Sequence, residues 1–144
     1  MNFTIRNAKI SDCVALQYLN RESMGYDHSI QKTEENLKKT LCKEYECVLV
    51  ADDGEKAVGY IHACEYCLIF SEPMVNVLGL AVDSRFARQG IGKALMKAVE
   101  EWAKSRGAKG IRLVSGETRL GAHAFYEKCG YISNKTQKNY KKLF

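Results

Sequence analysis

The sequence is poor in proline, with Pro73 as the single one in 144 residues, and it has no internal repeat or low-complexity tract. No apolar run approaches the roughly 20 residues that a membrane-spanning helix needs. Residues 1–6 lack the apolar stretch of a secretion signal. We therefore expect no membrane partner and a cytoplasmic location. The length suits one domain, residues 1–144, because typical domains hold about 100–150 residues.

What the sequence does contain is an ordinary globular composition, with 46% hydrophobic and 27% charged residues. The net charge of +5 is mild and suits an anionic ligand better than a nucleic-acid surface. The lysines are scattered, except for Lys135, Lys138, Lys141 and Lys142. Because a charge run is usually a solvated face, we interpret this group as a solvated strand or tail and do not expect a nucleic-acid partner.

Six cysteines raise the question of a metal site or of disulfides, but no secretory signal accompanies them. Cys64 and Cys67 form a C-x-x-C pair inside an apolar run, residues 60–70, that predicts a strand. Alternation along a strand would send the two thiols to opposite faces. No second C-x-x-C completes a zinc site. The prediction is no metal and six reduced, buried, inert thiols.

Hydrophobic spacing predicts a single mixed α/β domain. The strongest helix covers residues 90–106, where Ile91, Leu95 and Val99 recur at helical spacing. Further helices are expected at residues 12–21, from about residue 33, and at 120–129. Strands are expected at residues 4–8, 47–51, 57–70, 75–82 and 111–114, with a final pair at 131–132 and 139–143 that would close the sheet.

A glycine-containing connection, Arg88-Gln89-Gly90-Ile91-Gly92-Lys93, lies between a predicted strand and the start of the strongest helix. A helix start offers unpaired N–H groups and about half a positive charge, which suits a phosphate. A Walker A loop is excluded by Ala87 and Ala94, and a dinucleotide fingerprint by Leu95. The loop alone leaves a phosphate site and a simple turn equally open.

Two segments resemble the GNAT superfamily of acetyl-CoA-dependent N-acetyltransferases. Residues 82–95 are similar to its motif A, Q/R-x-x-G-x-G/A, and residues 122–131 to its A-x-x-F-Y-x-x-x-G-F/Y segment. The resemblance covers nearly the whole chain in order. It implies an α/β fold with a mixed, mostly antiparallel sheet, a splayed central strand pair and flanking helices. One departure is Ala87, where the family carries Arg or Gln.

The resemblance also implies where acetyl-CoA, the expected co-substrate, would bind. Its pantetheine arm would hydrogen-bond to the backbone of Leu80, Ala81 and Val82. Its pyrophosphate would lie on the loop and helix start, where Arg88 partly replaces the side chain missing at position 87. Arg119 would contact a phosphate or the acceptor, or form a surface salt bridge. The expected phosphate-binding residues are Arg88, Gln89, Gly90, Ile91, Gly92 and Lys93.

Tyr126 is the expected catalytic residue, because the family's equivalent tyrosine often protonates the leaving thiolate. Helical spacing alone favours a core aromatic at this position, and the match to the family segment reverses that preference. The base is open. Positions where relatives carry a Glu correspond to Asn76, which could hold a water, and Val114. Weaker candidates are Glu117, Glu65, His62 and His123.

The resemblance therefore predicts an acyltransferase that moves acetyl from acetyl-CoA directly to a primary amine, with a small molecule favoured as acceptor. Two alternatives stay open: a non-catalytic acyl-CoA-binding module of the same fold, and a protein N-terminal or lysine acetyltransferase. The acceptor pocket is expected between the loop at residues 24–30, the strand around Glu65 and the C-terminal strands. A homodimer is a further expectation from the family.

Overall fold

The computed structural model describes residues 2–144. They form two compact units, one ending at Leu113 and the other beginning at Val114. Each unit is described by itself, and a single domain over residues 1–144 stays a prediction. No helix within residues 2–144 is long and apolar enough to cross a membrane.

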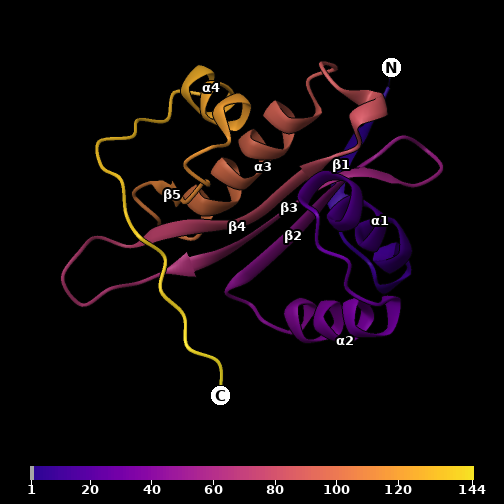
Figure 1. The fold of residues 1–144 in the computed structure, drawn as a ribbon, viewed down its shortest axis with the longest axis horizontal. Helices are drawn as coiled ribbons and strands as arrows, with labels where there is room; N and C mark the ends of the chain where they lie inside the picture. The colour runs from indigo at the N-terminus through magenta and orange to yellow at the C-terminus, as the bar shows by residue number, and fades with distance from the viewer. Residues whose placement is uncertain (1) are drawn as a thin grey trace. The chain divides into compact units, whose positions relative to one another are not determined.

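The first unit is built on a five-stranded sheet whose strands lie in chain order (Figure 1). Neighbouring strands from β1 to β4 pair antiparallel, and β4 pairs with β5 in parallel. This confirms the predicted mixed, mostly antiparallel sheet. The strands are β1 (Thr4–Asn7), β2 (Glu46–Asp52), β3 (Ala57–Tyr66), β4 (Met74–Val82) and β5 (Ile111–Leu113).

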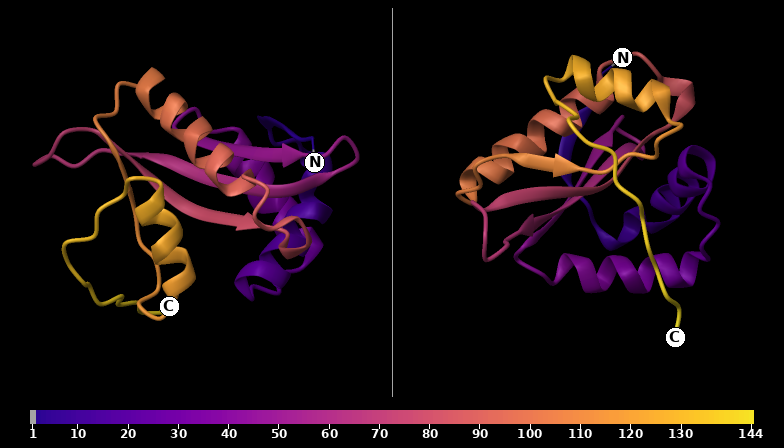
Figure 2. Two further views of the ribbon diagram at one scale, coloured as in Figure 1. Left: turned by 90° about the horizontal axis from the view of Figure 1, so that it is seen from above. Right: turned by 60° about the vertical axis from the view of Figure 1, so that its left-hand side comes forward.

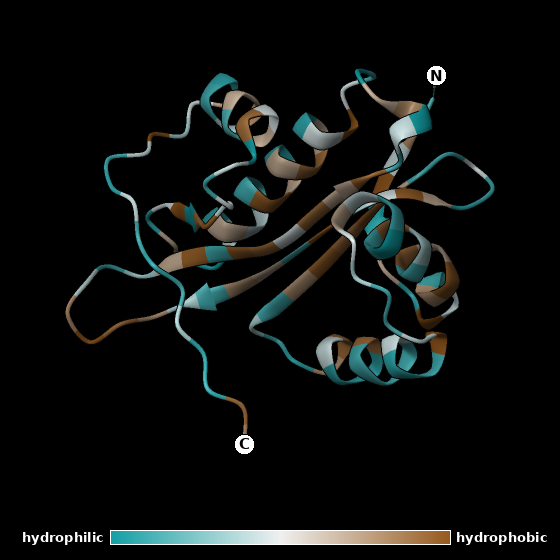
Figure 3. Cartoon of the chain, in the orientation of Figure 1, coloured by the Kyte–Doolittle hydropathy of each residue, from teal (hydrophilic) through white to brown (hydrophobic). Residues whose placement is uncertain are grey.

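Helices cover both faces of this sheet (Figure 2). α3 (Ile91–Ser105) packs on one face, where a Cβ placed on Gly59 would lie 3.0 Å from Ile91. α1 (Cys13–Met24) and α2 (Ile30–Leu41) pack on the other, where Leu16, Leu37 and Val48 share a buried cluster. The strands are mostly apolar and the helices carry polar outer stripes (Figure 3). Two short 3-10 helices, η1 (Ile10–Asp12) and η2 (Ser84–Phe86), complete the unit.

The pairing of β4 with β5 is short, which confirms the predicted splayed strand pair. β5 contacts β4 only from Val75 to Val77, whereas β4 continues to Val82 beside β3. The β3–β4 register also shifts between His62 and Ala63, which leaves Leu78 as an extra residue. Within the first unit, the edge of β4 from Leu78 to Val82 therefore has no strand partner.

The predicted strand at residues 57–70 is too long, since β3 ends at Tyr66. Its neighbours run out there: β2 begins opposite Cys64, and β4 begins opposite Tyr66. Without partners the backbone leaves the sheet, and Ile69 and Phe70 are exposed. The apolar run was a poor guide because its last residues form the tip of a β-hairpin.

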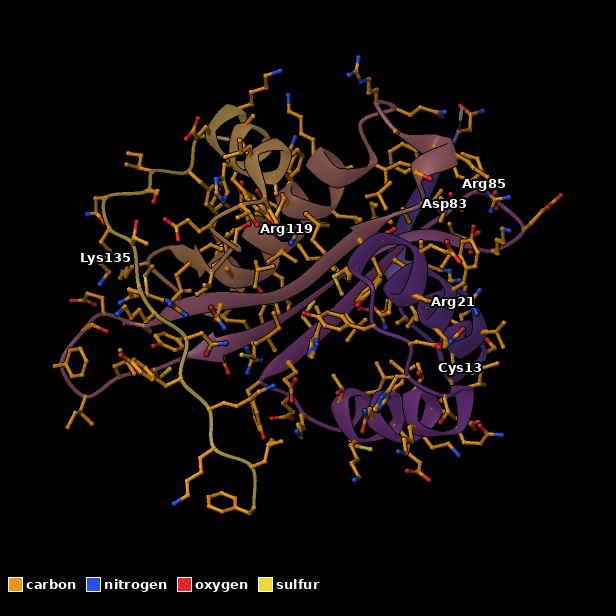
Figure 4. All side chains as sticks on the ribbon, viewed as in Figure 1. Cys13, Arg21, Asp83, Arg85, Arg119 and Lys135 are labelled. Atoms are coloured by element: carbon orange, nitrogen blue, oxygen red, sulfur yellow. The ribbon has the colours of Figure 1, made fainter. Side chains whose placement is uncertain are left out.

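The second unit contains one helix, α4 (Leu120–Lys128), and a long C-terminal segment. The predicted strands at residues 131–132 and 139–143 are wrong, because residues 129–144 contain neither helix nor strand. Four lysines interrupt this segment, and Ile132 and Leu143 are exposed. An alternating apolar face that could offset the entropy of ordering a strand is missing. Lys135 lies on this extended segment (Figure 4).

Candidate functional site

The open edge of β4 presents backbone hydrogen-bonding groups. Asp83 N–H donates to the Val58 carbonyl at 2.9 Å, so alternate residues of β4 turn their N–H and C=O toward β3. By this alternation Ala81 faces β3, whereas Leu80 and Val82 face the open edge. The Val82 carbonyl accepts a hydrogen bond from Ser23 Oγ at 3.0 Å. Of the three residues expected to contact the pantetheine arm, Leu80 and Val82 turn backbone groups to the open edge, and Ala81 turns its own toward β3.

The loop after β4 bends the chain into the start of α3. Arg88 has a φ of 61° and Gly90 a φ of 81°, both left-handed. Gly90 is the N-cap of α3 and supplies no side chain to cap it, and the first intrahelical bond is from Ala94 N–H to the Gly90 carbonyl. The N–H groups of the first helical turn, residues 91–93, are left for a ligand. A Cβ on Gly90 would meet no chain atom within 4 Å, so backbone can be approached there.

The charged side chains around this loop differ in whether they already have an ion-pair partner. Arg85 is tied to Asp83, with Nη2 2.7 Å from the carboxylate (Figure 4). Its hydrogen bond lowers the pKa of Asp83, so this pair is charged at neutral pH. Arg88 and Lys93 are exposed and make no hydrogen bond or ion pair within residues 2–144. Those two, and not Arg85, are available to an anion on the loop.

In the first unit, a cavity of about 530 Å³ opens on the face of the sheet that α1 and α2 cover. This volume lies within the range of small-molecule sites, about 300–1,000 Å³. A Cβ on Gly79 of β4 would lie 3.6 Å from Tyr60 Oη and 3.9 Å from Met24 Cε, two side chains that line the cavity. The cavity therefore adjoins β4 one residue before Leu80. Its lining is Leu16, Asn20, Met24, Gly25, Tyr26, Asp27, His28, Thr33, Asn36, Leu37, Thr40, Val48, Tyr60 and His62.

The cavity is apolar on its floor and weakly charged on its walls. Leu16, Leu37 and Val48 contribute the apolar surface, and Asp27 is the single carboxylate in the lining. Tyr60 Oη donates to Asn20 Oδ1. Burial raises the pKa of Tyr60 to about 12, so its phenol stays protonated at neutral pH. Such a wall can hydrogen-bond a neutral polar group and hold one cation.

His62 is the cavity residue with a carboxylate partner. Its Nε2 lies 2.7 Å from Glu46 Oε1, and Lys43 Nζ lies 3.0 Å from the other oxygen of that carboxylate. Burial opposes the charge on Glu46, but the hydrogen bonds from His62 and Lys43 outweigh it and lower the pKa of Glu46. The imidazole thus faces the cavity with an ionised carboxylate behind it.

Two residues that the sequence placed near the acceptor have other partners. Asn76 Oδ1 accepts a hydrogen bond from Arg112 at 2.6 Å. Glu65 pairs with Arg106 at 3.2 Å and does not line the cavity. Of the segments expected to form the acceptor pocket, the loop at residues 24–30 contributes to the lining of this cavity, and Glu65 does not.

The second unit holds Tyr126, Arg119 and His123. Tyr126 is half-buried, with its ring centroid 5.2 Å from Phe125 and 6.3 Å from Tyr131. Burial raises the pKa of the Tyr126 phenol and Arg119 opposes this, so the phenol carries its proton at neutral pH. His123 has one ring nitrogen 2.8 Å from the Gly116 carbonyl. A catalytic role for His123 would have to use its other ring nitrogen.

The six cysteines are not uniformly buried. Cys13 and Cys47 are buried, whereas Cys42 and Cys67 are exposed. Burial raises the pKa of Cys47 to about 11, which keeps that thiol protonated. The prediction of six buried thiols is wrong for the exposed pair, because Cys67 lies beyond the end of β3. Among residues 2–144, no three His, Cys, Asp or Glu side chains are grouped to hold a metal ion.

The family model for the acetyltransferase (GNAT) family matches residues 13–131. This match covers most of the chain, so the chain belongs to the GNAT acetyltransferase family. The match runs across the boundary between the two units. The resemblance inferred from residues 82–95 and 122–131 is confirmed.

Relatives of known name agree with this assignment. N-acetyltransferase 8 of Homo sapiens is 34% identical over 95 residues, which are 65% of this chain and 42% of that protein. The chain spans about half the length of the first curated relatives it matches. An aminoglycoside acetyltransferase, meta-AAC0020 from an uncultured soil metagenomic sample, superimposes with a TM-score of 0.86 at 24% identity, covering 99% and 97% of the two chains.

A second structural neighbour was solved with a ligand. AAC(6')-Iy, in complex with the bisubstrate analogue CoA-S-monomethyl-acetylneamine, superimposes with a TM-score of 0.87 at 17% identity, covering all of both chains. At such identity the likeness of these two structures establishes the fold and nothing about the acceptor.

The pairing of His62 with Glu46 is the feature of the site that the sequence analysis did not predict. The two residues are 16 positions apart and meet only through the β2–β3 register, in which Val48 pairs with His62 and Glu46 with Cys64. The available signal was that His62 lies in the predicted strand at residues 57–70 and that Glu46 comes directly before the predicted strand at 47–51. Without a register, His62 was one of several histidine and glutamate candidates.

Proposed function

We propose that the chain transfers an acetyl group from acetyl-CoA directly to the primary amine of a small molecule. One observation carries the proposal: the open edge of β4 at Leu80 and Val82 continues into a loop of left-handed residues and the uncapped start of α3. A strand edge suits the amide-rich pantetheine arm. A helix start with free N–H groups suits a pyrophosphate.

Loop chemistry supports the same anionic ligand despite the missing side chain at position 87. Arg88 and Lys93 are exposed and unpaired within the described residues, so both can approach phosphate oxygens. The N–H groups at residues 91–93 add the positive end of the α3 dipole. Together these groups replace the one guanidinium or amide that Ala87 lacks.

The cavity supports a small acceptor. It adjoins β4 at Gly79, next to the proposed pantetheine edge, and its volume matches a small molecule. With Asp27 as its single carboxylate, it suits a monoamine with a partly apolar body better than a polycation. Tyr126, protonated at neutral pH, is proposed as the acid for the leaving thiolate.

The test is release of CoA from acetyl-CoA in the presence of 2-phenylethylamine, glucosamine, spermidine, kanamycin, or a peptide with a free N-terminus and one lysine. CoA is separated by chromatography, because the exposed Cys42 and Cys67 would react with a thiol dye. We expect amine-dependent release, fastest with a monoamine. Binding of acetyl-CoA without release by any amine would indicate the non-catalytic module instead, and fastest release with the peptide would indicate a protein acetyltransferase.

A further inference from the structure

We propose that His62 is the general base that deprotonates the acceptor ammonium, and that Glu46 is the positioning residue that fixes the ring and stabilises its protonated form. This inference rests on the proposed function. The structural basis is the placement of His62 in the cavity lining, with Nε2 2.7 Å from Glu46 Oε1.

A base is required because a primary amine is mostly protonated at neutral pH, with a pKa near 10.4 for a lysine-type amine. Imidazole is the side chain that accepts and returns a proton in this pH range. The Nδ1 of His62 has no hydrogen-bond partner within residues 2–144, so the contact with Glu46 leaves that nitrogen for a ligand. The His62 side chain is 26% exposed and the Glu46 side chain 9%, so the pair connects cavity and interior.

The other titratable groups around the cavity suit this role less well. Tyr60 lies two residues before His62 on the same strand and stays protonated. Asp27 and His28, from the loop between α1 and α2, are exposed, and neither has an ion-pair partner within the described residues. The residues that α1 and α2 direct at the cavity, including Asn20, Asn36 and Thr40, carry no charge. The charges behind His62 are those of Glu46 and Lys43, with the Cys64 thiol beside them.

The proton balance is complete without an added reactant. His62 takes one proton from the ammonium, and the free amine nitrogen attacks the thioester carbonyl. The C–N bond forms, the C–S bond breaks, and the nitrogen loses its second proton while the leaving thiolate gains one. His62 then returns its proton to solvent through the open cavity. The net products are an acetamide, CoA thiol and one proton.

The test is the pH profile of kcat/KM for the fastest amine of the panel. An imidazole base gives a limb that falls tenfold per pH unit on the acid side, within about pH 5–8. We expect His62→Gln to abolish this limb and to lower kcat/KM by about 10²- to 10⁴-fold. Acetyl-CoA affinity, measured by calorimetry, stays unchanged because the proposed CoA edge lies on β4.

Two neighbouring variants give opposite shifts and do not require removal of the base. Glu46→Gln removes the carboxylate that stabilises the imidazolium, so the limb moves to lower pH. Lys43→Gln removes a competing cation from an exposed position, so the limb moves to higher pH. A purely structural role for the pair would change the rate without moving the limb.

His123→Gln is the matched comparison, because His123 is the competing histidine. A limb that survives in His62→Gln, or that disappears in His123→Gln, would overturn the inference while leaving the acetyltransferase activity established. Absence of amine-dependent CoA release by the wild-type chain would remove the proposed function and this inference with it.

Discussion

The two units of the chain differ in how they bury side chains. The first has a core of fully buried residues, among them Leu95, Val99 and Ile61. The second has no buried residue between positions 114 and 144, a range that includes its helix α4. The difference indicates that the first unit provides the folding free energy, whereas the second contributes Tyr126 with little packing of its own.

This contrast predicts that substitutions in the two units have different effects on stability. Burial of apolar surface provides most of the free energy of folding, about 25 cal/mol per Å². A residue outside the packed core can therefore be altered with little loss of stability. The following predictions test whether stability depends mainly on the first unit, and whether Tyr126 of the second unit acts in the proposed reaction.

The largest effect is expected in the second unit, from Tyr126→Phe. This change removes one hydroxyl and keeps the ring that contacts Phe125 and Tyr131. Loss of a general acid costs about 10²- to 10⁴-fold in rate, so we expect a fall in kcat of this order. Acetyl-CoA affinity and Tm stay nearly constant, as measured by calorimetry. Turnover at the wild-type rate would make Tyr126 a packing residue and water the proton donor.

The next effect belongs to the core of the first unit. Leu95→Ala leaves a cavity under α3 and should lower the free energy of unfolding by about 2–5 kcal/mol, measured by urea denaturation. Leu120→Ala in α4 is the matched change, since Leu120 is also helical but 73% exposed. It should alter stability by less than about 0.5 kcal/mol. Equal losses at both positions would mean that the second unit has a core of its own.

Sequence reasoning succeeded where a local pattern determines structure. The spacing of Ile91, Leu95 and Val99 predicted α3 to within a residue, and Gly90 marked its start. Glycine and helical periodicity act within a few residues, so a single sequence is enough to detect them.

Reasoning from sequence failed where the structure depends on contacts between segments that are far apart in the chain. The end of β3 depends on where β2 and β4 begin, and the C-terminal strands required a partner that hydropathy did not supply. The contacts of Asn76 with Arg112 and of His62 with Glu46 depend on register between strands. Register follows from the whole sheet, so these partners could not be chosen from the residue types alone.

The two ends of α3 allow a third prediction. Gly90 and Gly107 both have a left-handed φ, 81° and 79°, and a Cβ on either would meet no chain atom within 4 Å. Alanine at each position should therefore cost similar strain, about 1–2 kcal/mol. Only Gly90→Ala should weaken the binding of acetyl-CoA, by about 10- to 150-fold. This is the equivalent of one hydrogen bond to a charged group, at about 1.5–3 kcal/mol. Calorimetric titration of both variants checks this, and equal affinities would place the pyrophosphate elsewhere.

The smallest effect concerns pH and the contact between Arg6 and Asp52. Arg6 Nε donates to Asp52 Oδ2 at 2.7 Å, and this hydrogen bond, with one from Gly54 N–H, lowers the pKa of Asp52. A carboxylate with a lowered folded-state pKa stabilises the protein above its unfolded pKa of about 3.9, and that stability is lost as the pH falls through the lower, folded-state value. Asp52→Asn keeps an oxygen for Gly54 but loses the charge. It should cost about 0.2–1 kcal/mol at pH 7, as partly exposed pairs do.

Urea denaturation at pH 7 and at pH 3 tests this sign. The wild-type and Asp52→Asn curves should differ at pH 7 and converge as the pH falls to 3, because the wild-type carboxylate is then becoming protonated. Added salt at 1 M should reduce the difference at pH 7, since it screens a partly exposed pair. A difference that is unchanged by both pH and salt would assign the effect of Asp52 to its bond with Gly54 and not to its charge. The pH dependence of the first unit would then depend on the more buried Asp12, which accepts two hydrogen bonds from the same arginine at 2.8 Å.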